Sequence, residues 1–325
     1  MIIKPKRVPL FLRKLRALQK RLPQNHPKLP LILEELSKRE AGYKGESSLD
    51  YHLSFLDPNQ YFIFHDLRLR FQTHYFQMDI LIVSRSFIVI LEVKNIAGSL
   101  FFDTIFNQLI RTKDGVETAF QDPLIQIQRQ ESNLKNWLLN KQIPDMPIFS
   151  LVVISNPHTI IRTPPKYHYL NYKIIRPEII SNKINHFEIT SEEVILTEKE
   201  LKKLAKMINK EDTVLDSPIL ERFQIDSSEL RKGVFCNSCG FLPMIRTHGS
   251  WYCPSCKTYC KNGHLQALND YRLLVSNEIT NMEMRKFLII SSRANTTRLL
   301  QSMNLSFIGN NKGRIYQLPY FNDSK

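Results

Sequence analysis

The sequence of 325 residues predicts an α/β fold whose core runs helix, three strands, helix and strand (αβββαβ), followed by two small C-terminal modules. Two apolar, β-branched runs at 77–83 and 87–94 flank a short polar turn, which indicates a β-hairpin buried on both faces for most of its length. Apolar residues at a helical period follow at 122–140, and a short apolar strand follows at 148–154. Five cysteines then fall between residues 236 and 260.

The elements of the predicted core occur in order along the chain. The first helix is expected at about 46–56, with Glu46 in its first turn, because leucines repeat on one face. Strands are expected at 61–67, 76–83 and 87–94. Asp122 is a natural N-cap for the helix at 122–140, and Pro123 follows it at the first helical position.

Beyond the core the pattern is weaker. Short strands are expected at 172–175 and 194–196, and a capped helix at 197–208. Residues 209–232 are polar and charged, so we expect a linker there.

Three charged side chains lie inside the predicted hairpin: Asp79, Glu92 and Lys94. A charge in a buried strand is costly unless it is paired or binds a metal. Glu92 and Lys94 are two residues apart, so they leave the same face of their strand, and Asp79 on the neighbouring strand can reach that face. Two carboxylates and an amine at one point suit a hard divalent cation and a phosphate. The alternative is an exposed ion pair at a strand end.

Asp79, followed by Glu92-Val93-Lys94 on the next strand, resembles the D…(D/E)-x-K signature of the PD-(D/E)XK nuclease superfamily. Met78 stands where the signature has proline. The surrounding residues narrow the resemblance to the nuclease-related (NERD) domain, over about residues 40–160. They are Gly45-Glu46 upstream, Gly98 after the motif, and the segment 123–126 that begins the later helix. The resemblance implies a restriction-endonuclease-like core and hydrolysis of phosphodiester bonds.

Phosphodiester hydrolysis requires an activated water and neutralisation of the developing charge, and Mg²⁺ or Mn²⁺ can supply both. Asp79 and Glu92 are the expected metal ligands, with the carbonyl of Val93 as a third. Lys94 would orient or deprotonate the water, or stabilise the transition state.

Three further residues are candidates for the same site. Glu46 would hold the same or a second ion, although it could instead only favour a helix N-terminus through the dipole. Gln126 would position the substrate or the water, or it is an ordinary surface glutamine. Gln130, one turn later, shares its face and is the weaker candidate.

The cysteines form two pairs with metal-binding spacing. Cys236 and Cys239 are one pair, and Cys253 and Cys256 follow after 13 intervening residues. Four thiolates satisfy the tetrahedral preference of Zn²⁺, so the module resembles a zinc ribbon. Cys260 or His264 could replace one ligand, and four reduced structural cysteines without metal are the alternative.

Residues 270–320 resemble a winged helix-turn-helix. A capping box at 280–283 begins one helix, Ser291-Ser292 caps a second, and two strands flank the turn at 309–313. The second helix carries residues that are expected to be exposed, namely Arg293, Thr296, Thr297 and Arg298. The wing carries two basic residues, Lys312 and Arg314. Arg293, Arg298, Lys312 and Arg314 are candidates for nucleic-acid binding. Such modules also serve protein contacts.

The net charge of +14 is unevenly distributed. Residues 1–44 carry 12 Lys/Arg against 3 Asp/Glu, residues 231–325 carry 13 against 4, and the middle is about −4. Basic ends suit nucleic acid, with solubility or anionic lipid as alternatives. No apolar run approaches the ~18–20 residues of a membrane span, and the basic N-terminus lacks the apolar core of a secretory signal. We therefore expect a cytoplasmic protein.

Together these observations predict a basic arm at 1–44, a nuclease-like domain at 45–208, a linker at 209–232, a zinc ribbon at 233–264 and a winged-helix-like domain at 270–320. The expected function is that of a metal-dependent nuclease acting on DNA, with the C-terminal modules aiding binding. The alternatives are a non-catalytic nucleic-acid-binding protein on a nuclease-like scaffold, and a regulatory protein whose tail recruits a partner.

Overall fold

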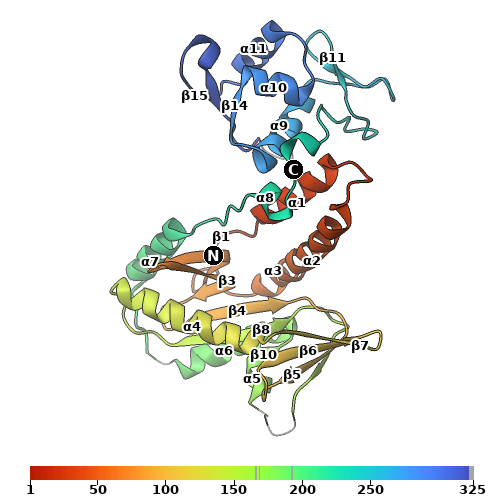
Figure 1. Ribbon diagram of the computed structural model, residues 1–325. Helices are drawn as coiled ribbons and strands as arrows, with labels where there is room; N and C mark the ends of the chain where they lie inside the picture. The colour runs from red at the N-terminus through yellow and green to blue at the C-terminus, as the bar shows by residue number, and fades with distance from the viewer. Residues whose placement is uncertain (165–166, 168, 192, 322–325) are drawn as a thin grey trace. The chain divides into compact units, whose positions relative to one another are not determined.

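The computed structural model describes residues 1–164, 167, 169–191 and 193–321. It confirms the mixed α/β fold and divides the chain into two compact units (Figure 1). The first unit comprises Met1–Pro9 and Lys38–Leu215, and the second comprises Leu10–Ser37 and Asp216–Lys325. The N-terminal segment 1–44 is therefore shared between both units.

The first unit is built on a six-stranded sheet with the order β1-β2-β3-β4-β8-β10. Its strands are β1 (Ile2–Lys4), β2 (Phe62–Phe71), β3 (His74–Val83), β4 (Ile88–Lys94), β8 (Ile148–Ile154) and β10 (Ile174–Ile175). β2, β3 and β4 are antiparallel neighbours, whereas β8 pairs with β4 in parallel. The predicted hairpin is β3–β4.

Helices cover both faces of this sheet, which is why β4 and β8 read as almost continuous apolar runs. One face packs against α4 (Pro123–Asn140) and α7 (Glu198–Glu211), and the other against α3 (Leu49–Leu53) and α6 (Ile180–Thr190). Figure 1 shows α4 lying along β4 and β8. The predicted caps form: the Asp122 side chain accepts a hydrogen bond from the Leu124 N–H, and Thr197 and Glu200 make a capping box.

A second, four-stranded sheet has the order β7-β6-β5-β9. Its strands are β5 (Ser99–Asp103), β6 (Gln108–Lys113), β7 (Val116–Gln121) and β9 (Ile160–Arg162). The sequence analysis missed the β6–β7 hairpin. Its turn is Asp114-Gly115, both with positive φ, as a tight hairpin turn requires.

The prediction that a helix begins at about residue 46 is wrong. A longer helix, α2, runs Leu29–Ser47, and α3 begins after Ser48. Glu46 therefore lies in the last turn of α2, because nothing in the preceding segment interrupts helical geometry. At a helix C-terminus the dipole disfavours a carboxylate, so dipole stabilisation does not explain Glu46.

The segments around 170–196 also differ from expectation. α5 (Leu170–Lys173) and the 3-10 helix η1 (Pro177–Ile179) flank β10, so only 174–175 are extended in the sheet. Residues 194–196 form no strand; the N–H groups of Ile195 and Leu196 instead donate to the Arg85 carbonyl.

The second unit joins N-terminal and C-terminal segments. Its helices are α1 (Leu10–Arg21), α8 (Ile219–Phe223), α9 (Gly263–Leu274), α10 (Asn281–Leu288) and α11 (Arg293–Ser302), with the 3-10 helices η2 (Ser227–Glu229) and η3 (Asn311–Gly313). Helix α1 packs on α9, and the buried Arg21 guanidinium donates to Asp270, with Nε 2.7 Å from Oδ2. The expected linker at 209–232 is wrong over its second half, because Ile219, Phe223 and Leu230 are buried in this unit.

Two small sheets complete the second unit. One has the order β11-β12-β13, with β11 (Ile245–Arg246), β12 (Trp251–Tyr252) and β13 (Tyr259–Cys260). The other has the order β14-β16-β15, with β14 (Glu278–Thr280), β15 (Phe307–Ile308) and β16 (Ile315–Gln317). Among the described residues of the chain, no helix combines the length and apolar character needed to cross a membrane.

Candidate active site and metal centre

The sheet of the first unit is irregular where its acidic residues lie. In β2 the positions that face α4 and α7 change from even to odd (62 and 64, then 67 and 69), and in β3 they change from odd to even (83 and 81, then 78 and 76). Asp66, with φ 51, lies at the change in β2, and Asp79 lies at the change in β3. A positive φ within a strand marks a local bulge, and bulges re-aim side chains.

Asp79 is held by the backbone of the neighbouring strand. Its Oδ2 accepts a hydrogen bond from the Val93 N–H at 2.8 Å. Ladder pairing of β3 with β4 begins one residue later, where Ile80 faces Leu91. Asp79 thus lies beside the Glu92-Val93-Lys94 segment.

Glu92 and Lys94 leave the same face of β4, the face covered by α4. The Lys94 Nζ donates to Glu92 Oε1 at 2.7 Å and to Gln126 Oε1 at 3.0 Å. The Gln130 Nε2 donates to Glu92 Oε2 at 2.8 Å. Both carboxylate oxygens of Glu92 therefore accept hydrogen bonds, and the residue is only 2% exposed to solvent. The structure therefore brings Gln126 and Gln130, both on α4, onto the two charges of β4.

Glu46 reaches the cluster from the last turn of α2. Its Oε2 is ion-paired with the ammonium of Lys6, which follows β1. The Lys6 side chain is only 4% exposed, and its Nζ lies 5.5 Å from the centre of the Tyr43 ring. Sequence reasoning missed Lys6 because it stands 40 residues before its partner, without a motif of its own.

The carboxylates of this cluster influence one another. Burial raises the pKa of Asp79 well above its usual value, and the charges of Glu92 and Glu46 raise it further. Burial also raises the pKa of Glu46, against the lowering effect of Lys6. The site is therefore electrostatically unfavourable for its own negative charges, and a bound cation would relieve that cost.

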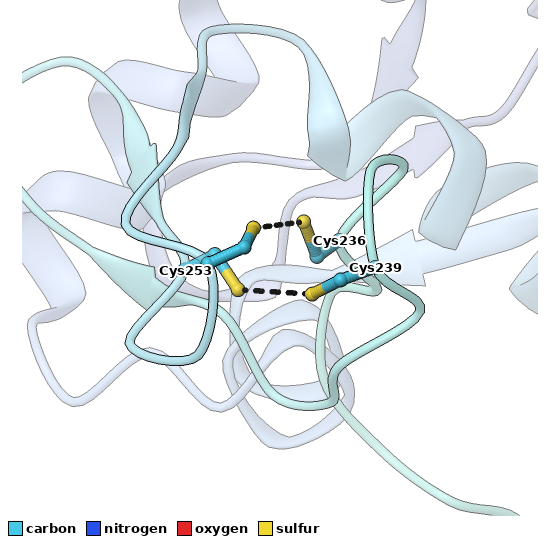
Figure 2. A group of neighbouring side chains, drawn as sticks. Cys236, Cys239 and Cys253 are labelled. Carbon is cyan, nitrogen blue, oxygen red and sulfur yellow. Dashed lines mark hydrogen bonds between the residues drawn. The ribbon is translucent and has the colours of Figure 1, made fainter.

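The four paired cysteines converge in the second unit. Cys236 Sγ lies 3.5 Å from Cys256 Sγ, and Cys239 Sγ lies 3.5 Å from Cys253 Sγ. Figure 2 shows the side chains of Cys236, Cys239 and Cys253 pointing toward the centre of this cluster. All four sulfurs lie within 4.8 Å of one another. Each pair is followed by a left-handed residue, Gly240 or Lys257, whose N–H donates to the carbonyl of the first cysteine.

The leftover ligand candidates lie outside this cluster. His264 is buried, and its Nδ1 accepts from Trp251 Nε1 at 3.3 Å. Burial, together with the nearby Arg246, lowers the pKa of His264 to about 4, so its ring is neutral. Cys260 is at the end of β13. The geometry therefore favours the two cysteine pairs as the four metal ligands.

Part of the first unit matches a known protein family. Residues 41–155 match the model of the family described as the nuclease-related domain. Residues 41–155 form a NERD domain. The match spans Glu46, Asp79, Glu92, Lys94, Gln126 and Gln130, and it excludes Lys6.

The other comparisons add little to the NERD match. A comparison with curated proteins gave no match. Among solved structures, the crystal structure of protein VC1899 from Vibrio cholerae matches with 14% identity and a TM-score of 0.26, over 56% of this chain and 50% of that one. This chain thus spans half the length of that protein, and a TM-score this low supports no argument.

The acidic cluster of the NERD domain fits one hard cation. Mg²⁺ takes one or two carboxylates and fills its remaining positions with water and substrate phosphate. Asp79 and Glu92 supply two carboxylates. In the part of the chain that the structure describes, only the four cysteines form a group of three or more tightly spaced metal-binding side chains, so Glu46 does not complete a three-carboxylate site.

The cysteine cluster of the second unit fits Zn²⁺. Tetrahedral coordination at about 2.3 Å places sulfurs about 3.8 Å apart, close to the separations seen. The Thr258 hydroxyl, 3.6 Å from Cys236 Sγ, is the main cause that lowers the pKa of Cys236 to about 5. Burial raises the pKa of Cys253 to about 11, so this thiol gains most from a cation that stabilises its thiolate.

Gly45 lets α2 approach the NERD sheet closely enough to deliver Glu46. A Cβ at this position would lie 2.4 Å from Asn95 Cβ and 2.7 Å from Ser155 Oγ. We expect Gly45→Ala to destabilise the first unit by about 1–3 kcal/mol, because the helix must shift away from the ends of β4 and β8. Thermal denaturation measures the loss. The matched control is Gly42→Ala on the same helix, where a Cβ meets nothing within 4 Å; it should be neutral or stabilising by about 0.5–1 kcal/mol. Equal effects of the two substitutions would contradict the close-approach role.

The C-terminal residues expected to bind nucleic acid differ in their exposure to solvent. Arg293 and Arg298 are exposed on α11, whereas Thr296 is buried, which corrects the expectation that it is exposed. The Arg314 guanidinium lies 4.0 Å from the centre of the Phe307 ring. The side chain of Lys312 lies outside the described residues.

Proposed function

We propose that the protein is a metal-dependent nuclease that hydrolyses phosphodiester bonds in DNA. The observation that supports it most is the convergence of Asp79, Glu92 and Lys94 in a NERD domain, with Gln126 on the Lys94 ammonium. In this proposal Asp79 and Glu92 hold the cation. When bound there, Mg²⁺ would polarise the scissile phosphate and make a bound water more acidic.

Lys94 is the residue best placed to act on the reacting atoms. Its ammonium keeps two hydrogen bonds, to Glu92 and Gln126, which leaves one N–H to point at a water or a phosphate oxygen. The water oxygen forms a bond to phosphorus, the ester P–O bond breaks, and the water proton leaves to solvent while the leaving oxygen is protonated. Lys94 stabilises the negative charge that develops on the phosphoryl oxygens.

A cleavage assay with the full chain tests the proposal. Labelled single- and double-stranded DNA and RNA are incubated with Mg²⁺, with Mn²⁺, or with a chelator. We expect DNA to be cut only when a divalent cation is present. Salt-sensitive binding without cleavage under either metal would contradict the proposal, and would favour the non-catalytic nucleic-acid-binding alternative.

The second unit is proposed to hold the nucleic acid. Counted by unit, it carries 20 Lys/Arg against 10 Asp/Glu, compared with 25 against 21 in the first. Helix α9, strand β14, helices α10 and α11, and strands β15 and β16 follow one another, and β16 lies between the other two strands. This order supports the proposed winged helix, with α11 as the recognition helix.

We expect Arg293→Gln combined with Arg298→Gln to weaken DNA binding and to reduce the slope of log affinity against log salt by about 2. Fluorescence anisotropy over a salt series measures this. Point substitutions are preferable to deleting residues 231–325, because α1 packs on α9 and would lose its partner. The control is Lys202→Gln together with Lys206→Gln on α7, in the first unit. An unchanged slope in the α11 variant would contradict the assignment.

A further inference from the structure

Lys6 is an unusual group to find beside a candidate cation site. Its ammonium is nearly buried and is paired with Glu46, in the same unit that holds Asp79 and Glu92. Removing an ammonium from water costs several kcal/mol unless a partner compensates it. Nothing about the pairing of β1 with β2 requires this charge, because the strand ends at Lys4.

Lys6 and the carboxylates form one electrostatic system. Glu46 follows Gly45, which lies against Asn95, and Asn95 directly follows Lys94 at the end of β4. Lys6 neutralises Glu46 on one side, and Lys94 lies on Glu92 on the other. Glu46 is thus occupied by a cation that the chain itself supplies.

The charge count of this system favours one divalent cation. Glu46, Asp79 and Glu92 with Lys6 and Lys94 leave one net negative charge. One divalent cation therefore brings the site to a single positive charge, ready for an anionic phosphate. Two divalent cations would leave a strong positive excess in a partly buried place, which is unfavourable.

We propose that the Lys6 ammonium replaces a second divalent cation, so that the centre binds one cation through Asp79 and Glu92 while Lys6 holds Glu46. This inference rests on the proposed function of the acidic cluster. Lys6 is a positioning residue, since it acts through Glu46 and its buried side chain does not reach a substrate. Many nucleases and phosphatases use two metal ions about 3.5–4 Å apart; here a lysine supplies the second positive charge.

Counting bound Mn²⁺ tests the inference without measuring cleavage. The full chain, with its zinc content determined separately, is titrated with Mn²⁺, and free Mn²⁺ is followed by electron paramagnetic resonance. The number of sites at the acidic cluster is the number of Mn²⁺ ions bound by each protein minus the number bound by Asp79→Asn. This subtraction cancels weak sites elsewhere on the chain. We expect a difference of one for the wild type and of two for Lys6→Met, which keeps the side-chain length and removes the charge. The matched control is Lys4→Met, whose lysine pairs with Asp212 at 2.6 Å, with an expected count of one.

The outcomes separate the inference from the proposed function. A wild-type count of two, or a Lys6→Met count that stays at one in a folded protein, overturns the role of Lys6 and leaves the nuclease proposal standing. A wild-type count of zero overturns both. If Lys6→Met does not fold, Glu46→Gln decides: the inference expects it to keep one Mn²⁺, and loss of that ion would show that Glu46 is itself a ligand.

Discussion

Glu92→Gln is expected to lower the rate of Mg²⁺-dependent DNA cleavage by at least about 100-fold while the fold is retained. The substitution keeps the size of the side chain but leaves one acceptor oxygen where the carboxylate has two, so it can accept from either Lys94 or Gln130 but not from both. It removes the negative charge that would bind the cation and that orients Lys94 at 2.7 Å. Gln130 can still pair with the new amide, so the packing between β4 and α4 should survive. Initial rates at saturating Mg²⁺, measured beside a thermal denaturation curve, give both quantities.

The control for this variant is Asp145→Asn, which removes an exposed carboxylate of the same unit, outside the acidic cluster. Its cleavage rate should stay within about twofold of the wild type, because an exposed pair with Lys135 contributes little. Undiminished cleavage by Glu92→Gln would show that the activity belongs to another site.

Cys253→Ser is expected to release zinc and to unfold the core of the second unit. Cys253 and its neighbour Trp251 are fully buried, and they share one core with helices α9, α10 and α11. The module is short, so we expect its folding to depend on a bound metal, because structural zinc sites supply on the order of 10–16 kcal/mol of apparent binding energy. Metal analysis of the purified variant, with tryptophan fluorescence to follow the exposure of Trp251, measures the effect.

Cys260→Ser is the matched control, since Cys260 lies in the same module outside the four-sulfur cluster. It should keep its zinc and its fluorescence. Zinc retained by Cys253→Ser, or lost from Cys260→Ser, would mean that the ligand set is different from the two cysteine pairs.

The elements with a strong local signal were predictable. The β3–β4 hairpin follows from two apolar runs and a polar turn, and α4 follows from its period and the Asp122 cap. Because side chains alternate along a strand, the two-residue spacing of Glu92 and Lys94 sufficed to place them together, as the 2.7 Å contact confirms.

The remaining features depend on non-local packing. Lys6 reaches Glu46 because β1 pairs with β2, more than 50 residues later, and no local pattern signals such a pairing. A helix was expected to begin at about residue 46, whereas Gly45 lies inside α2, where it allows close packing on Asn95. Helix α1 was expected in a basic arm, yet its buried Arg21 finds Asp270 in the second unit.

We propose that Asp79 and Glu92 hold the cation of a phosphodiesterase centre beside Lys94. The most direct measurement is the anomalous scattering of Mn²⁺ in crystals of the full chain. We expect one manganese peak within about 2.1–2.4 Å of carboxylate oxygens of both Asp79 and Glu92, apart from a zinc peak among the four cysteines. A manganese peak elsewhere, with none between Asp79 and Glu92, would contradict it.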